Sequence, residues 1–320
     1  MAGLGLIGGS IALALRERGW YVTGDDLQQA RIDRALTMKA IDAHGFDPSA
    51  EITFVATPVL AVVDQVKRAL ADSTGLVTDV GSVKGGITAA IDDPRFVGGH
   101  PMAGSELDGF DGADASMFEG AVWVLTPSTT TADSTFSQVA AVVAELGADV
   151  VALPADRHDQ VVAVISHVPH LAAATLMGLA SDRAEEHAAL LRLAAGGFRD
   201  MTRIASGHPA IWLDICAENR PAILSALDGL IEGLTSMRDV VDRDDRTALF
   251  DRLQHARDAR TNLPNRVDPS ELAEVRIPIP DRPGAAAEVF TLAAELGVNI
   301  ASFEVVHSVE GNRGVAVVLV

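Results

Sequence analysis

Two stretches of this chain carry side chains that could move a proton. His100 lies in the glycine-rich stretch Gly98–Glu106, and Ser82 lies in the stretch Asp79–Gly85. A histidine can accept the proton of an alcohol while hydride leaves the carbon that bears it. A lone histidine is more often structural, but two glycines before His100 and a proline after it favour a functional position. We therefore expect His100 and Ser82 to lie at a catalytic site.

Two further stretches could recognise a substrate. The run Ser166-His167-Val168-Pro169-His170 spaces two histidines three positions apart, and such positions share one face of a helix. Both could face a cleft, or each could be an ordinary interhelical histidine. Arg203, with Arg199 as second choice, could clamp a carboxylate through two parallel hydrogen bonds, although most arginines are surface residues. No carboxylate stands at ligand spacing from the histidines, so we expect no metal.

A glycine motif near the start of the chain predicts a dinucleotide site. The fingerprint G-x-G-x-x-G is matched by six consecutive residues, Gly3-Leu4-Gly5-Leu6-Ile7-Gly8. Its glycines allow a tight turn, close approach of a pyrophosphate, and close packing of helix on strand. A predicted strand then ends in Asp25-Asp26. A carboxylate there accepts ribose hydrogen bonds and repels a 2′-phosphate, so we favour Asp26 and NAD. Alternatively, the glycine motif could form a turn that binds no cofactor. Either aspartate could also be an ordinary solvated turn residue.

Alternating strands and helices predict how these residues are positioned. Short apolar runs that end in turn residues indicate strands at 20–24, 52–56, 75–80, 95–98, 122–125 and 149–153, and helical patterns cover 7–18, 59–71 and 134–146. This alternation is typical of βαβ units and a parallel sheet. Ligands bind beyond the carboxyl ends of such strands. Thr57-Pro58, Ser82 and His100 all follow predicted strands and should line that crevice.

The pattern changes twice along the chain. We predict an α/β Rossmann dinucleotide-binding domain over 1–154 and an all-α domain over 155–264, with helical stretches at 158–180, 185–194, 209–219 and 221–241. After a linker at 261–269, residues 271–320 read as a βαββ unit. The first strand should supply about five residues before Gly3, but only Met1 and Ala2 precede it. We therefore expect either that the start of the sequence is trimmed or misassigned, or that the first strand is stunted. The short C-terminal module likewise suggests a trimmed end.

Composition limits the kinds of partner. The formal net charge of −19 argues against nucleic acid, because phosphate binding needs clustered Lys and Arg. The single cysteine, Cys216, argues against a disulfide scaffold. The glycine-interrupted run Leu4–Leu15 is too short to span a bilayer and has no basic leader. We expect a cytoplasmic protein without a membrane partner, whose acidic surface requires a local basic pocket for any anionic substrate.

At this point the motifs resemble those of the prephenate dehydrogenase family, which includes the arogenate and cyclohexadienyl dehydrogenases of tyrosine biosynthesis. The resemblance extends over roughly residues 3–240. The matching strings are GLGLIGGS (3–10), DVGSVKG (79–85), GGHPMAGSE (98–106), SHVPH (166–170) and FRDMTRIA (198–205), and Trp212 is the last matching residue. The resemblance implies a Rossmann domain followed by a helical domain that forms an intertwined homodimer.

The resemblance also implies an activity and residue roles. The reaction is the NAD-dependent oxidative decarboxylation of prephenate to 4-hydroxyphenylpyruvate. His100 would take the proton of the ring hydroxyl, Ser82 would bind that hydroxyl and help place the nicotinamide, and Arg203 would hold a substrate carboxylate. The remaining substrate pocket would be formed by Ser105, Glu106, Ser166, His167, His170 and Trp212. The cofactor would be bound by Gly3, Gly5, Leu6, Ile7, Gly8, Asp26, Thr57, Pro58 and Ser82.

The final βαββ unit resembles the beginning of an ACT domain, a small amino-acid-sensing fold. The stretch Asp281–Gly284 matches the turn before its first helix. The second helix and last strand of the usual βαββαβ order are absent, so the module is partial. Tyrosine or another aromatic amino acid could bind it, or could compete at the active site.

Three alternatives remain open from the sequence. Arogenate could replace prephenate, because no motif distinguishes an amino from an oxo group on the side chain. Other Rossmann-type hydroxyacid dehydrogenases usually rely on a lysine in the helical domain, and this chain has no lysine after Lys84. A non-enzymatic NAD-binding sensor would bind the cofactor without turnover.

Overall fold

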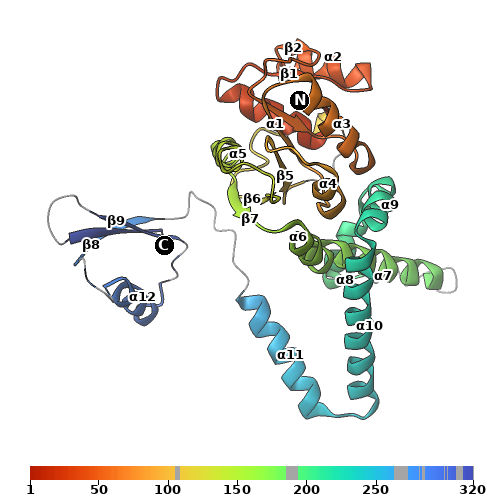
Figure 1. Cartoon of the computed structure of the whole chain (residues 1–320). Helices are drawn as coiled ribbons and strands as arrows, with labels where there is room; N and C mark the ends of the chain where they lie inside the picture. The colour runs from red at the N-terminus through yellow and green to blue at the C-terminus, as the bar shows by residue number, and fades with distance from the viewer. Residues whose placement is uncertain are drawn as a thin grey trace. The chain divides into compact units, whose positions relative to one another are not determined.

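The computed structural model describes residues 1–104, 109–184, 194–262, 273–280, 282, 285–298, 300, 302–307 and 313–319. Figure 1 shows the order of the elements along the chain. Residues Met1–Leu249 form one compact unit and Phe250–Val320 form a second. Each unit is described by itself below.

The first unit begins with a nucleotide-binding region built on a five-stranded sheet of order β3-β4-β5-β6-β7. Its strands are β3 (Ile52–Val55), β4 (Leu76–Asp79), β5 (Phe96–Pro101), β6 (Val122–Thr126) and β7 (Asp149–Ala152). A separate parallel pair comprises β1 (Thr23–Gly24) and β2 (Ala43–His44). The helices of this region are α1 (Leu6–Glu17), α2 (Gln29–Thr37), α3 (Val59–Asp72), α4 (Gly85–Ala90) and α5 (Asp133–Glu145), with the 3-10 turn η1 (Phe110–Gly112).

The expectation of an all-parallel sheet is wrong at one pair of strands. β5 and β6 are antiparallel, with His100 opposite Val124. Parallel neighbours need a crossover connection, usually a helix, whereas antiparallel neighbours do not. In the described residues between these strands, 102–104 and 109–121, only the short turn η1 is helical. The chain therefore turns back along β5 without crossing over.

The residues before the glycine turn join the two sheets. Ala2 makes parallel bridges to both Asp25 and Val55, and the amino group of Met1 donates to Thr23 O at 2.7 Å. The strand predicted from Trp20 begins only at Thr23. The preceding Val22 N–H instead donates to the Asp42 side chain at 2.7 Å.

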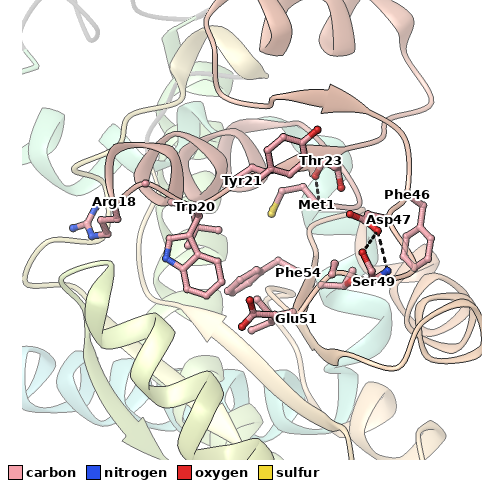
Figure 2. Close-up of a pocket in the computed structure, with 16 residues that line it drawn as sticks. Met1, Arg18, Trp20, Tyr21, Thr23, Phe46, Asp47, Ser49, Glu51 and Phe54 are labelled. Carbon is pink, nitrogen blue, oxygen red and sulfur yellow. Dashed lines mark hydrogen bonds between the residues drawn. The ribbon is translucent and has the colours of Figure 1, made fainter.

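A pocket of about 540 Å³ lies beside these residues (Figure 2). It is lined by Trp20–Thr23 and Glu51–Phe54, together with Phe46, Asp47 and the end of α1. These stretches precede or begin β1 and β3, so the pocket lies at the amino edge of the sheet. It is therefore separate from the carboxyl edge where the predicted ligand crevice lies.

Apolar side chains cover both faces of the inner strands of the five-stranded sheet, whereas the edge strand β7 is largely exposed. One cluster joins α1 and α5 to the sheet and includes Leu4, Phe54 and Trp123, all buried. The indole of Trp123 meets the rings of Phe54 and Phe118 at centroid distances of 6.3 and 5.1 Å. A second cluster, with Val66, packs α3 and α4 on the other face. Burial of both faces explains why the strands read as continuous apolar runs.

The helical region continues the first compact unit. It comprises α6 (Ala155–Val162), the π-helical turn η2 (Ala163–His167), α7 (Val168–Ala184), α8 (Gly196–Thr202), the 3-10 turn η4 (Arg203–Ser206), α9 (Pro209–Glu218) and α10 (Arg220–Asp242). The next helix, α11 (Arg246–Thr261), begins in this unit, and its residues from Phe250 onward belong to the second unit. The helix predicted at 158–180 is interrupted by η2. Most of the helix predicted at 185–194 lies outside the described residues, as does most of the predicted linker at 261–269. Among the described residues, its buried apolar cluster includes Val83, Ala163, Ile215 and Ile223.

The continuous helical segment Ala155–Arg183 is long and apolar enough to cross a membrane by length and composition. Only 33% of its most apolar window is buried within the chain. Core helices of soluble proteins pass the same test, so this is weak support for a membrane span.

The second unit contains the predicted βαββ order. Its elements are β8 (Glu274–Pro280), α12 (Ala285–Glu295), β9 (Ser302–His307) and β10 (Arg313–Leu319). β10 pairs antiparallel with both other strands, which gives the order β8-β10-β9. A small cluster that includes Ile279, Val289 and Ala316 joins the helix to the sheet. In the predicted turn Asp281–Gly284, only Arg282 is among the described residues.

Candidate active site

Asp79 ties together the carboxyl ends of two neighbouring strands. It ends β4, and its Oδ1 accepts a hydrogen bond from Gly99 N in β5 at 3.2 Å. Its Oδ2 accepts from Gly81 N at 2.8 Å and pairs with Lys84 Nζ. The Lys84 side chain is fully buried, and this burial lowers the pKa of Lys84 while the charge of Asp79 opposes the shift. Lys84 therefore holds the turn between β4 and α4.

His100 is linked to α6 through a chain of hydrogen bonds. Its Nδ1 atom lies 2.8 Å from Nε2 of His158, and the two rings meet edge to face. The Nδ1 atom of His158 lies 2.8 Å from Oδ1 of Asp159. Because α6 begins the helical region, the contact joins that region directly to the end of β5.

Asp159 is held as a carboxylate at the start of α4. Its two oxygens accept hydrogen bonds from Lys84 N and Gly85 N, both at 2.8 Å. Although burial raises the pKa of Asp159, the hydrogen bonds from His158 and these backbone groups hold it below its usual value. The negative charge also lies favourably at the positive end of a helix.

The electrostatic surroundings keep the His100 imidazole neutral. Burial is the largest cause that holds the pKa of His100 well below its usual value. The positive charge of Lys84 acts in the same direction, as do His158 and His167 in their protonated forms. A neutral imidazole has one nitrogen with a free lone pair, so His100 can accept a proton near neutral pH.

His167 and His170 meet on one indole. The His170 ring stacks on Trp212 with centroids 3.5 Å apart, and the His167 ring approaches the same indole edge to face at 6.1 Å. Asn219 joins His167 to α6, because its Nδ2 donates to Asp159 O at 2.8 Å and lies 3.2 Å from His167 Nδ1. Burial lowers the pKa of His167 to about 4, against the opposing charge of Asp159. Burial also lowers the pKa of His170.

The glycine turn has the close approaches that its motif predicts. Gly3 has a positive φ of 95°, and a Cβ there would lie 2.5 Å from Ala56 O. A Cβ on Gly8 would lie 2.1 Å from Gly3 O, so only glycine fits at either position. A Cβ on Gly5 would meet nothing within 4 Å. The space above Gly5 is therefore open for a pyrophosphate at the start of α1.

The side chain of Asp26, rather than that of Asp25, contacts the glycine turn. Its Oδ2 accepts from Leu4 N at 2.8 Å, and its Oδ1 accepts from Gln28 N at 2.9 Å. Arg31 Nη1 lies 3.6 Å from the same carboxylate. Asp25 instead pairs with exposed His44 at 3.3 Å. The carboxylate of Asp26 is thus anchored beside the place where a dinucleotide ribose would lie.

Thr57 gives a further sign that the site fits a dinucleotide. Its Oγ1 atom is buried and has no hydrogen-bond partner among the described residues. Thr57 and Pro58 follow β3, and a Cβ on Gly3 would lie 3.2 Å from Thr57 N. The orphan hydroxyl, the open space at Gly5 and the anchored Asp26 together fit NAD.

The other site residues that were predicted from the sequence and are described by the structure lie outside the hydrogen-bonded network of His100, His158 and Asp159. Ser82 follows β4 and Ser166 lies in η2, and both side chains are partly buried. Arg203 is exposed at the start of η4, and Arg199 donates to Ala194 O at 3.2 Å. Ser105 and Glu106 lie outside the described residues, so their contacts stay predictions.

Four polar residues of this network were not identified as site residues from the sequence: Asp79, His158, Asp159 and Asn219. Asp79 lies in a matching string at the end of a predicted strand, and this position could have identified it as a site residue. The pair His158-Asp159 follows Pro154 at a predicted helix start, but no spacing pattern connects it to His100. Only the packing of α6 against the end of β5 does so.

A dinucleotide-type glycine turn and a neutral histidine at the carboxyl edge of the same sheet define a nucleotide-dependent dehydrogenase. The models of two family domains match most of the chain. These are the prephenate dehydrogenase nucleotide-binding domain over residues 11–152 and the prephenate dehydrogenase dimerization domain over residues 154–255. The chain therefore belongs to the prephenate dehydrogenase family.

Individual relatives agree with this assignment. Prephenate dehydrogenase of Bacillus subtilis (strain 168) is 34% identical over 332 residues, which cover 98% of this chain and 90% of the relative. The structure of prephenate dehydrogenase from A. aeolicus with hydroxyphenyl propionate and NAD+ has a TM-score of 0.77 and 29% identity, covering 81% of this chain and 96% of the other. Arogenate dehydrogenase of Synechocystis has a TM-score of 0.71 and 31% identity, covering 81% and 97%.

Proposed function

We propose that this enzyme catalyses the NAD-dependent oxidative decarboxylation of prephenate to 4-hydroxyphenylpyruvate. The observation that carries the proposal is the neutral His100 at the end of β5, on the sheet edge that also carries the glycine turn. NAD, when bound, accepts hydride from the ring carbon that bears the hydroxyl. The family membership and the NAD complex of the A. aeolicus relative support this assignment.

His100 accepts the hydroxyl proton during this reaction and later returns it. The proton moves from the hydroxyl oxygen to the imidazole as carbonyl character develops on the ring carbon. The ring carboxylate then leaves as carbon dioxide, and the electrons of the broken bond complete the aromatic ring. The proton returns to the same oxygen, which becomes the phenol hydroxyl. A positioned base of this kind contributes about 10²–10⁴ to the rate.

The other site residues bind and orient the substrate and the cofactor. Ser82 contacts the same hydroxyl and helps to place the nicotinamide, while Arg203 holds a substrate carboxylate. The remaining substrate pocket is formed by Ser105, Glu106, Ser166, His167, His170 and Trp212. Gly3, Gly5, Leu6, Ile7, Gly8, Asp26, Thr57 and Pro58 bind NAD. Because prephenate is a dianion and the chain carries a net charge of −19, the positive charge of Arg203 is the local attraction that the substrate needs.

A substrate assay tests the proposal and separates its alternatives. NADH formation is measured with prephenate, arogenate and simple hydroxyacids, each with NAD and with NADP. We expect turnover of prephenate with NAD. Turnover of arogenate instead would assign the alternative, which the similarity to the Synechocystis enzyme supports. Turnover of hydroxyacids alone, or NAD binding without any turnover, would contradict the proposal.

Two variants test the residue roles. His100→Asn should lower kcat by about 100-fold or more, because it removes the base. Arg203→Ala should raise KM for the substrate by about 10-fold or more with a smaller change in kcat, because a charged hydrogen bond contributes about 1.5–3 kcal/mol. An unchanged kcat in the first variant, or an unchanged KM in the second, would move these roles to other residues.

We also propose that two copies of the chain form a homodimer through the helical region and that the enzyme works in the cytoplasm. The family's dimerization-domain model over residues 154–255 supports the dimer. The proposed domains are 1–154 for NAD, 155–264 for substrate and dimerisation, and 271–320 for an ACT-like module.

Feedback by tyrosine or another aromatic amino acid is a separate proposal. The order of β8, α12, β9 and β10 supports the ACT-like interpretation of the second unit. Isothermal titration with tyrosine, phenylalanine and tryptophan tests it, and an absence of binding heat for all three would contradict it.

A further inference from the structure

The histidine that we propose as the base does not stand alone, and its neighbours have a role of their own. We propose that His158 and Asp159 are positioning residues that hold His100 in the tautomer whose Nε2 atom accepts the hydroxyl proton. This inference rests on the proposed function, because it gives His100 the role of the base.

Asp159 determines which nitrogen of His158 carries the proton. The carboxylate can only accept hydrogen bonds, and it already accepts those of Lys84 N and Gly85 N. His158 Nδ1 lies 2.8 Å from the same carboxylate, so this nitrogen must be the donor. The opposite nitrogen of a neutral His158, Nε2, then has a free lone pair.

His158 in turn determines the tautomer of His100. The lone pair of His158 Nε2 faces His100 Nδ1 at 2.8 Å, so His100 Nδ1 carries the hydrogen and donates it. A neutral His100 has only one proton on its ring, which leaves Nε2 unprotonated. The two rings are buried or partly buried, so water does not readily replace either contact. The chain of contacts thus selects the nitrogen that can act as a base.

The same chain supports His100 after it has accepted the proton. The imidazolium keeps its Nδ1–H donated to His158, whose other nitrogen donates to the negative Asp159. Of the other charged side chains described at this sheet edge, Lys84 is positive and Asp79 is already paired with it. His167, which also lies near His100, is kept neutral by its burial, which lowers its pKa to about 4. Asp159 is therefore the negative charge that stabilises the transient cation.

Two substitutions of His158 separate positioning from packing. His158→Phe keeps a ring but removes both nitrogens, and we expect kcat to fall about 10-fold or more, with KM for prephenate within about twofold. His158→Gln offers an oxygen that can accept from His100 Nδ1, so it should recover most of the lost kcat. His208→Asn is the matched control, because exposed His208 caps α9 and Asn is a good capping residue.

A spectroscopic measurement tests the tautomers without relying on activity. In the full-length enzyme labelled with 15N-histidine, long-range proton–nitrogen correlations should show an Nδ1–H tautomer for both His100 and His158. The signals are assigned with the variants His100→Asn and His158→Gln. An Nε2–H tautomer of His100 beside a doubly protonated His158 would overturn the proposal, even if His158→Phe failed to fold.

The outcomes also distinguish this proposal from the proposed function. Wild-type kcat in a folded His158→Phe, with His100→Asn inactive, overturns the positioning role alone. Wild-type kcat in His100→Asn removes the base itself, and both proposals fail together with it.

Discussion

The nucleotide-binding region and the helical region bury their apolar side chains to different extents. In the first region, the large side chains of Phe54, Phe118 and Trp123 are at most 1% exposed. In the second, Leu213 is 74% exposed and Leu234 is 60% exposed. The buried apolar cluster that joins Val83 to the described helical residues contains only small and medium side chains, although the partly buried Trp212 packs against it. One region thus completes its core with its own sheet and helices, whereas the other leaves an apolar surface.

This difference shows that a helix can form without being covered by its own chain. Large, contiguous patches of exposed apolar side chains normally mark an interaction surface. The match of residues 154–255 to a dimerization-domain model agrees with that interpretation. We therefore expect stability in the nucleotide-binding region to depend on internal packing, and stability in the helical region to depend on assembly and on neutral histidines.

The largest effect should come from the internal core. Trp123→Ala removes an indole that is fully buried between β6 and its neighbours, and should cost about 3–5 kcal/mol of unfolding free energy. Chemical denaturation followed by circular dichroism measures this cost. A loss below about 1 kcal/mol would show that this region does not depend on its own core.

Acid should destabilise the helical side next. His167 has a folded-state pKa of about 4, below its ordinary value of 6.5, so the unfolded chain binds the proton first as pH falls. Its stabilising contribution is complete above pH 6.5 and is lost between pH 6.5 and 4, by about 3 kcal/mol. Hydrogen exchange should show α6 to α10 opening before the sheet, and His167→Gln should flatten the dependence. If the sheet lost its protection from exchange at the same pH as α6 to α10, the predicted difference in acid stability between the two regions would be wrong.

The exposed helical surface should respond to charge. The double variant Ile231→Glu, Leu234→Glu places two carboxylates on one face of α10, where both side chains are largely exposed. Because burying each such side chain contributes about 1.5–3 kcal/mol, the dimer dissociation constant should rise about 100-fold or more. Sedimentation velocity measures the change. An unchanged dimer would assign the interface to another surface.

The smallest effect is expected at an exposed apolar residue of the nucleotide-binding region. Leu27 is fully exposed beside the end of β1, so Leu27→Glu should change stability by less than about 0.5 kcal/mol. The same variant is the matched control for assembly. Dissociation of the dimer by this substitution would remove the distinction between the two regions.

The sequence predicted those features that depend on local pattern. Gly3 and Gly8 have the close contacts expected of the fingerprint, and the strand and helix order of the nucleotide-binding region was largely anticipated. The direction of β6 was not, because strand direction depends on the connection and not on the strand's own residues. The short elements α2 and β2 were also missed, since their apolar positions are few.

The site residues, like the fold, could be predicted only where a local sequence pattern identifies them. His100 stands in a recognisable string and Asp26 follows a predicted strand at the fingerprint's usual spacing, so both could be proposed as site residues from the sequence. His158 lies 58 residues after His100 in the chain. It and Asp159 can be recognised as site residues only because α6 packs against β5 in the folded structure. Arg203 matches a family string, but its local placement does not identify its substrate contact. Long-range packing, unlike a turn or a cap, has no signature in one sequence.

The π turn η2 determines how α7 is rotated about its own axis. A wide turn holds one residue more than an ordinary helical turn, and each residue of a helix corresponds to about 100° of rotation. Deleting exposed Val164 would therefore turn α7 by about that angle and carry His170 away from Trp212. The additional residue of this turn thus sets the direction in which His170 faces the proposed substrate pocket, and its removal would redirect that pocket wall while leaving every proposed pocket side chain in the sequence.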